Sequence, residues 1–446
     1  MKKVKNIKFY NRPFFAMVVV FIITSCIDVL DIEEITNSEG SGLLVVEAIL
    51  TDEVKNQVVY LSRSDSRTDL ERDTTFIPFL TPGLRPRDTV NVETGALVKL
   101  LANNGLEFAF TETRDGLYRS DEVFGLQTDI DYQLEIVLDN GNEYTSQPVQ
   151  LQGKASLDNV YAERTISENG VDGVAIFVDG SPIEGVAENY RYNYVETYQV
   201  IAPFWVPQEF RLTNYTLCPE SDYTLEVVER EVQNRVCYNT IDSNEVIQTS
   251  TFNNTTNNIE RQLVRFIGKD NFIISHRYSI LVKQLVQSSA SFAFYETLRK
   301  FSNSESLFSQ IQPGELPANI TRKDGTEEPI LGWVEAVSVS EQRLFFDFED
   351  FFLGEELPLY PFNCNPLSVP ERTLACNEFG TVVQLVDGCP PGIVEGVDGN
   401  FYSFFDFYSP ELVPLSICPG DYVVVPSICG DCRLLGSNIE PNFWEE

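Results

Sequence analysis

Residues 131–141, DYQLEIVLDNG, contain the pattern that decides the fold class. Tyr132, Leu134, Ile136 and Leu138 are every second residue of this stretch, and this spacing places them on one face of a strand. The Asp-Asn-Gly sequence that ends the stretch supplies the positive-φ positions that a hairpin turn requires. The stretch is therefore predicted to be a half-buried β-strand followed by a tight turn.

Segments of the same kind recur on both sides of this stretch and predict a mainly β protein. They are short, rich in β-branched and aromatic residues, and separated by turn residues, as in sandwich proteins. The predicted strands before Gly153 are 43–50, 57–62, 96–101, 107–110 and 131–138, and those after it are 160–165, 173–179, 190–200, 272–286, 330–339 and 343–348. We interpret the two series as two immunoglobulin-like β-sandwich domains in tandem.

One segment has helical spacing instead. Phe294, Leu298 and Phe301 recur at intervals of three or four residues, and Ser288 or Ser289 can cap the start of a helix. One helix is therefore predicted at about residues 288–302, inserted in or appended to the second sandwich.

These elements and the local composition divide the chain into five parts. The predicted parts are a signal peptide at 1–25, an acidic flexible tether at 26–41, a first sandwich at 42–153, a second sandwich with a long insert and the helix at 154–362, and a cysteine-rich region at 363–446. The insert spans 208–259, and its polar tip at 251–258 is expected to be exposed.

The first 26 residues have the order of a secretion signal. Basic residues precede an apolar run from Phe14 to Ile23, and a small-residue site ending in Cys26 follows. The run is too short for a permanent membrane helix, which needs roughly 20 apolar residues. The four residues that end at Cys26, ITSC, resemble a bacterial lipobox. Cys26 is therefore expected to carry lipid and to become the first residue of the mature chain.

The other eight cysteines are expected to form disulfides, because an even number in an exported chain indicates an oxidising compartment. They are Cys218, Cys237, Cys364, Cys376, Cys389, Cys418, Cys429 and Cys432. Their connectivity is open among 105 possible pairings. Cys218 and Cys237 stand alone in their region and are predicted to pair with each other. The last six lie in a loop-rich region, where disulfides are expected to replace a core.

The formal net charge of -35 excludes nucleic acid as a partner, because so acidic a surface repels phosphate backbones and anionic lipid headgroups. One explanation of this charge is that it keeps the protein soluble. A second explanation is a field that attracts cations or basic peptides.

No catalytic, cofactor or metal site is predicted. His276 is the single histidine and lies in a predicted strand, so it is interpreted as a structural residue. The pair Cys429 and Cys432 lacks the second pair that zinc needs and the βαβ setting of a redox centre. The acidic pairs at 349–350 and 355–356, within the aromatic segment 345–362, are weak candidates for glycoside hydrolysis. The alternating tyrosines of 190–194 are interpreted as core rather than as a sugar-binding platform.

Several stretches resemble a family of Bacteroidetes lipoproteins known as domain of unknown function 4249. The closing sequence CGDCRLLGSNIEPNFW at 429–444 is similar to the end of that family, in which a C-x-x-C-R stretch precedes a glycine, an asparagine, a proline and a final Phe-Trp. The resemblance extends to LLVVEAILTDEVKNQVVYLSRS at 43–64, to PANI at 317–320 and to LGWVEAVSVSEQRLFF at 331–346.

The resemblance implies a location and a role. Such lipoproteins are typically encoded beside TonB-dependent outer-membrane receptors, which implies a non-enzymatic accessory that captures or hands over a ligand. The acidic run after Cys26 is similar to signals that send lipoproteins to the cell surface, so a lipid-anchored protein on the outer face of the outer membrane is expected. The alternatives are an adhesion or architectural lipoprotein without a transporter, and a carboxylate-based glycoside hydrolase.

Overall fold

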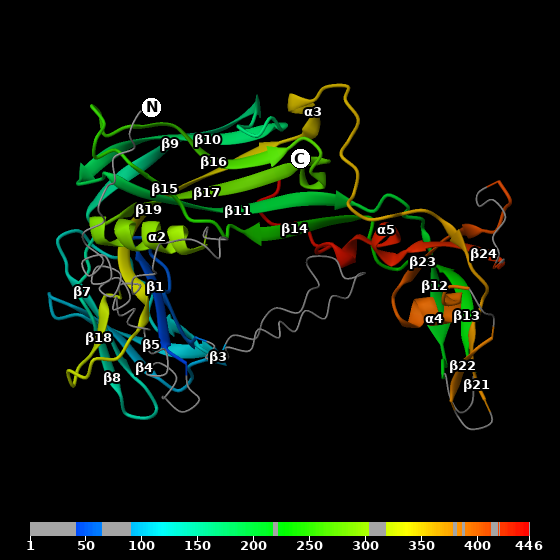
Figure 1. Cartoon of the computed structure of the whole chain (residues 1–446), viewed down its shortest axis with the longest axis horizontal. Helices are drawn as coiled ribbons and strands as arrows, with labels where there is room; N and C mark the ends of the chain where they lie inside the picture. Colours follow the sequence, from blue (N-terminus) through cyan, green and yellow to red (C-terminus); the bar gives the residue numbers. More distant parts are fainter. Residues whose placement is uncertain are drawn as a thin grey trace, which may run out of the picture.

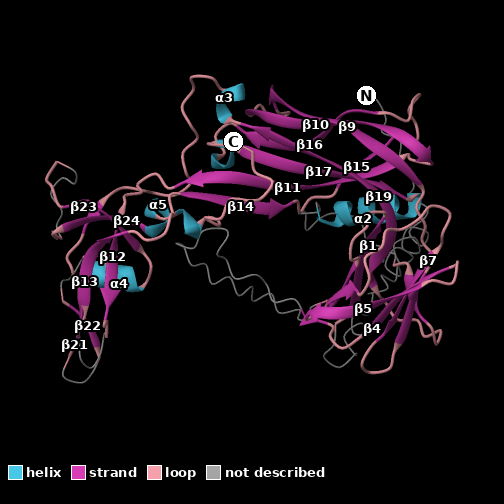
Figure 2. Cartoon of the chain, turned by 180° about the vertical axis from the view of Figure 1, so that it is seen from behind, coloured by secondary structure: helices cyan, strands magenta, loops and turns pink. Residues whose placement is uncertain are grey.

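The computed structural model describes residues 42–64, 91–216, 222–302, 318–377, 381–385, 389–411, 418 and 420–445. The prediction of a mainly β protein is confirmed. Figure 1 shows a central sandwich with a lobe at each end, and both lobes project from the same side of the sandwich. Figure 2 shows the same arrangement from behind, with strands dominating all three parts.

The N-terminal lobe is one sheet whose buried face encloses a core. Tyr132, Leu134 and Ile136 lie in that core, as their spacing predicts. The strands of the lobe are β1 (Leu44–Thr51), β2 (Val58–Arg63), β3 (Asn91–Val92), β4 (Leu97–Ala102), β5 (Glu107–Arg114), β6 (Leu117–Ser120), β7 (Tyr132–Val137), β8 (Glu143–Ser146) and β18 (Ile320–Arg322).

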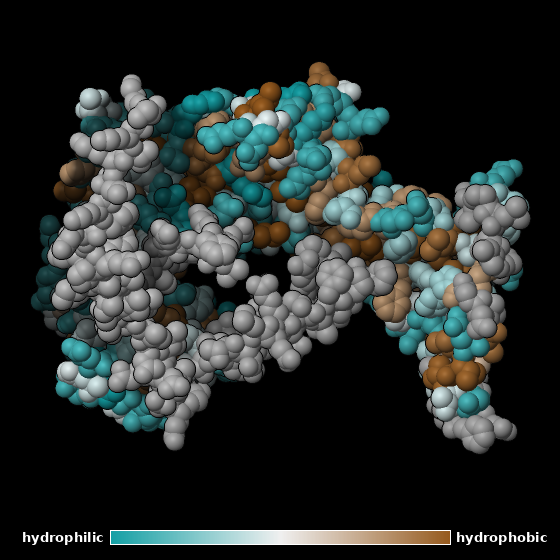
Figure 3. Space-filling model, in the orientation of Figure 1, coloured by the Kyte–Doolittle hydropathy of each residue, from teal (hydrophilic) through white to brown (hydrophobic). Residues whose placement is uncertain are grey.

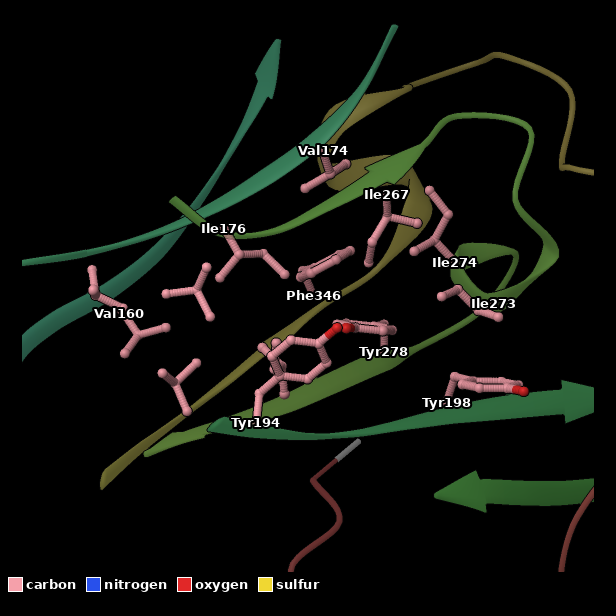
Figure 4. Close-up of a cluster of buried hydrophobic side chains, with 14 of the residues drawn as sticks. Val160, Val174, Ile176, Tyr194, Tyr198, Ile267, Ile273, Ile274, Tyr278 and Phe346 are labelled. Atoms are coloured by element: carbon pink, nitrogen blue, oxygen red, sulfur yellow. The ribbon is translucent and has the colours of Figure 1, made fainter. Parts of the chain in front are cut away.

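The central sandwich packs two sheets face to face. Its strands are β9 (Gly153–Ile166), β10 (Asp172–Gly185) and β16 (Ile259–Gly268) in one sheet, and β11 (Asn189–Ile201), β14 (Val236–Asp242), β15 (Ile247–Ser250), β17 (Tyr278–Gln287) and β19 (Leu331–Phe346) in the other. Figure 4 shows Val174 and Ile176 facing Tyr194 and Tyr278 across the core. The tyrosine stripe is therefore core, as the sequence indicated.

Strand β19 joins the lobe to the sandwich. Residues 331–337 pair with β1 in parallel, and residues 338–346 pair with β17 in antiparallel orientation. The two units consequently share one 14-stranded sheet. The two strands predicted at 330–339 and 343–348 are this single strand, because the polar residues between them pair with β17. Strands β1 to β8 precede the predicted boundary near Gly153, and β18 and residues 331–337 of β19, which follow it, also pair with strands of the lobe.

The side chain of Asn319 closes the sheet of the N-terminal lobe. The peptide N–H of Gln147, just after β8, donates to the carbonyl oxygen of Asn319 at 2.7 Å. The side-chain amide of Asn319 donates to the carbonyl of Val334 on β19 at 2.7 Å and accepts from the Val334 N–H at 3.0 Å. The side-chain amide of Asn319, just before β18, thus bonds to the backbone of β19 as a neighbouring strand would. It is buried, with 3% of its surface exposed.

The helix α2 (Ser289–Ser302) confirms the predicted helix, and Ser288 caps it by accepting from the N–H of Ser291 at 3.1 Å. The helix packs on strands β11, β17 and β19. Two shorter helices of the sandwich are η3 (Phe272–Ile274) and α3 (Phe348–Phe351).

The C-terminal lobe combines two distant parts of the chain. The hairpin of β12 (Gln208–Thr213) and β13 (Thr224–Glu229) comes from the predicted insert, and its Phe210 and Leu225 pack on a small core formed by Val369, Ile393 and Val424. The rest of the insert extends the central sheet. Of the tip predicted to be exposed, residues 252–258 are exposed, but Thr251 is buried because its N–H donates to the carbonyl of Glu188. The other elements of the lobe are β20 (Leu367–Ser368), β21 (Leu374–Cys376), β22 (Val382–Gln384), α4 (Ile393–Asp398), β23 (Tyr402–Phe407), β24 (Tyr422–Pro426), α5 (Ser427–Gly430) and η4 (Cys432–Leu434).

We expect Asn319→Ala to lower the free energy of unfolding by about 2 to 4 kcal/mol, because it leaves both polar groups of the buried Val334 peptide unpaired. Equilibrium denaturation of the purified protein measures this. Asn159→Ala, at an exposed position of β9, is the matched control and should change the stability by less than about 0.5 kcal/mol. Equal stabilities of the two variants would contradict a closing role for Asn319.

Candidate functional site

Three disulfides connect cysteines of the described residues. They are Cys237–Cys432, Cys364–Cys429 and Cys389–Cys418. The prediction that Cys218 pairs with Cys237 is wrong. Cys237 lies on β14, and the chain end returns to this strand, where the N–H of Cys432 donates to the carbonyl of Asn234 at 3.0 Å. Cys237 is therefore far from Cys432 in the sequence but adjacent to it in the folded protein. Cys218 lies outside the described residues.

The pair Cys429 and Cys432 is structural, as interpreted from the sequence. The two cysteines are fully buried and bond to different partners, one on the approach to the C-terminal lobe and one on β14. Between them, Asp431 accepts from the side chain of Asn234 at 2.8 Å and from the guanidinium of Arg433 at 2.6 Å. This knot fixes the C-terminal lobe to the central sandwich.

The closing signature at 429–444 is a clasp on the central sheet. Ser437 exchanges two backbone hydrogen bonds with Tyr238 of β14. Gly436 lies so close to this strand that a Cβ atom would stand 2.4 Å from the carbonyl oxygen of Tyr238. Asn438 donates to the carbonyl of Gln233 at 2.6 Å. The glycine and the asparagine of the signature are thus explained by packing.

The final aromatic residues complete the clasp. Trp444 packs edge-on against the rings of Tyr238 and Phe345, with centroids 4.9 and 5.7 Å away. The guanidinium of Arg343 lies 3.6 Å from the ring centroid of Phe443. The signature therefore anchors the chain end, and none of these contacts forms a catalytic arrangement.

The prediction that His276 lies in a strand is wrong. The side chain of Asn271 accepts from the N–H of Ile273 and starts the turn η3, so that β17 begins only at Tyr278. Burial lowers the pKa of His276, and the imidazole is consequently neutral at pH 7. No ion pair of His276 exists among the described residues.

The acidic pair 349–350 lies within the helix α3, and the pair 355–356 follows this helix. Glu355 receives a hydrogen bond from Arg164 at 2.8 Å and another from Lys269. These bonds, first from Lys269 and then from Arg164, lower the pKa of Glu355. A carboxylate held ionised in this way is a poor proton donor, whereas glycoside hydrolysis needs a general acid with a raised pKa.

The remaining acids of the segment do not assemble a second site. Asp350 accepts from the N–H of Asp347 at 2.8 Å and so caps α3, and Asp347 pairs with Arg277 at 2.6 Å. Glu349 and Glu356 are exposed. The rings of Phe348 and Phe352 turn inward to the core of the central sandwich.

The most buried charges lie beneath α2. Arg191 of β11 and Glu335 of β19 form an ion pair at 2.5 Å, and both side chains are nearly inaccessible. Glu335 also accepts from Gln287 at 3.1 Å and from the hydroxyl of Tyr295 at 3.2 Å. The guanidinium lies 3.8 Å from the centroid of the Tyr295 ring.

This network explains the docking of α2. Every oxygen of Glu335 is occupied, and Trp333 adds a stacked contact with Phe294 and a hydrogen bond to Ser291 at 2.9 Å. The arrangement serves packing, because no open position remains at the carboxylate. Sequence reasoning missed it, and the available signal was a charged residue within a locally apolar stretch, Arg191 among the tyrosines of 190–194 and Glu335 within 333–337.

Within the described ranges, no group of three or more His, Cys, Asp or Glu residues could hold a metal ion. A search of the same residues for a helix of membrane-spanning length and apolarity finds none.

These observations define a mainly β protein that is tied together by disulfides and whose closing sequence at 429–444 is a structural clasp. The chain matches the family model described as domain of unknown function (DUF4249) over residues 28–343, and it belongs to this family. The resemblance drawn from the sequence is confirmed, although the clasp at 429–444 lies beyond the matched residues. No curated protein matches the chain.

We expect digestion of the unreduced protein to yield a cross-linked pair of peptides that contain Cys237 and Cys432. The strands and turns place these residues together with a Cα–Cα distance of 5.5 Å. Peptide mapping by mass spectrometry, with a reduced sample as control, checks this. A cross-link between Cys218 and Cys237 would contradict the structure.

Glu355→Gln should lower the melting temperature at pH 7, and the difference from the wild type should shrink as the pH falls through the titration of this carboxyl. The pKa of Glu355 is lowered in the folded protein, so its stabilising effect is complete above the unfolded value of about 4.3 and is lost as the pH falls through the folded value. Melting curves of both proteins between pH 7 and 3 measure this. Glu356, which is exposed and has no ion pair with any described residue, is the control, and Glu356→Gln should show no such convergence.

Proposed function

We propose that this protein is an outer-membrane lipoprotein that works as a non-enzymatic accessory of a TonB-dependent transporter. The observation that carries the proposal is membership of the DUF4249 family, since a resemblance to this family implies proximity to such receptors. The secretion signal and the lipobox ending at Cys26 support a lipid anchor. We also propose that the two predicted sandwiches are immunoglobulin-like domains.

The contacts of the described residues support a binding role. The ionised state of Glu355 disfavours the hydrolase alternative. The knot around Cys429 and Cys432 holds the C-terminal lobe in position on the sandwich, and a body held rigid in this way loses little entropy when a partner binds. An adhesion protein would use the same features without a transporter.

The test is affinity purification of the tagged protein from detergent-solubilised membranes. We expect mass spectrometry to identify a TonB-dependent receptor, and we expect it to be absent when Cys26→Ala removes the lipid that brings the protein to the membrane. A cytosolic tagged protein provides the background control. Recovery of the protein alone from intact membranes would favour the adhesion alternative over the transporter accessory.

A further inference from the structure

The loop of residues 353–359, which follows α3, contains leucines whose side chains are exposed to solvent. Leu353 and Leu359 are 82% and 87% exposed, the highest values for large apolar side chains among the described residues. Leu357, between them, is 47% exposed. Figure 1 shows this loop passing over the end of the central sandwich, and Figure 3 shows apolar residues at the same place. Exposed leucines are common singly, but three within one short loop mark a contact surface.

The loop is fixed to the sandwich at several points. Glu355 is bound by Arg164 and Lys269, from the strands and turns of the opposite sheet. The hydroxyl of Ser275 donates to the carbonyl of Pro358 at 3.1 Å. Tyr360 exchanges hydrogen bonds with the backbone of Ile201 at 2.9 and 3.1 Å. The leucines between these points are therefore presented in a fixed position, which reduces the entropy lost when a partner binds.

The surroundings of the leucines are acidic. Glu349 and Glu356 are exposed and form no ion pair within the described part of the chain, and Arg164 and Lys269, which contact the loop, are already engaged by Glu355. Free negative charge beside apolar side chains disfavours an anionic membrane surface. The negative charge beside the leucines instead favours, as the binding partner, a protein surface with an apolar pocket and basic residues at the rim of that pocket.

We propose that the 353–359 loop is the surface by which this protein docks on its outer-membrane receptor, with Leu353 and Leu359 seated in an apolar pocket of that receptor. This inference rests on the proposed function and adds the contact surface to it. It gives the segment 345–362 a role in binding, in which the phenylalanines build the base, Glu355 fixes the loop and the leucines make the contact.

The experiment compares full-length lipoproteins in the receptor purification described above. Leu353→Glu together with Leu359→Glu should lower receptor recovery at least about tenfold, because anchor residues in an interface carry most of the affinity. The matched control is Leu97→Glu with Leu106→Glu, which adds the same charge at positions 67% and 53% exposed on the N-terminal lobe. The control should retain full recovery.

A second variant tests the charges without touching the leucines. Glu349→Lys with Glu356→Lys should reduce recovery severalfold, and the reduction should shrink at high salt. Equal melting temperatures of the variants and the wild type exclude unfolding as the cause.

The outcomes separate the two proposals. If the wild type brings down no receptor, the proposed function fails. If the wild type and the leucine variant bring down equal amounts, the docking surface is wrong while the proposed function stands. Binding of Cys26→Ala protein to lipid vesicles that depends on Leu353 and Leu359, with receptor recovery unchanged, would assign the loop to the membrane and overturn the docking proposal.

Discussion

The backbone hydrogen bonds on the two edges of β19 hold the molecule together. One half of this strand completes the N-terminal lobe through β1, and the other half completes the central sandwich through β17. The two units therefore behave as parts of one sheet, since a rotation between them would break paired backbone groups. The buried pair of Arg191 and Glu335 adds a link across the same region, because its partners stand on β11 and β19. The helix α2 then covers this link.

A sheet of this length has two ends, and other residues of the chain make hydrogen bonds beside each of them. At one end the amide of Asn319 joins β18 to β19, and at the other the clasp places Ser437 beside β14. Free edges of sheets invite pairing with other chains, and proteins commonly cover them. The PANI stretch and the closing signature, which are far apart in the sequence, thus perform the same task. Their polar residues are explained by edge protection.

The sequence predicts local structure well and long-range pairing poorly. Alternation in 131–141 and in the tyrosine strand identifies buried faces, and helical spacing identifies α2 within one residue. The role of β19 was not predictable, because periodicity reports which face is buried and carries no information about which strand lies alongside. The same limit explains the error at Cys237, whose partner lies 195 residues away. For the 345–362 segment, the sequence shows only that acids and aromatic residues lie close together along the chain. The structure adds that Glu355 pairs with Arg164 and Lys269 and that the leucines face outward.

The pairing of β1 with β19 has a consequence for folding during synthesis. Val45 pairs with Leu331, so the first strand of the lobe gains this partner only after nearly 300 further residues have been made. Synthesis from the N-terminus delivers β1 to β8 first, and these strands keep an unfinished edge until residues 318–337 arrive. The rate of chain elongation therefore sets how long this edge can pair with other chains.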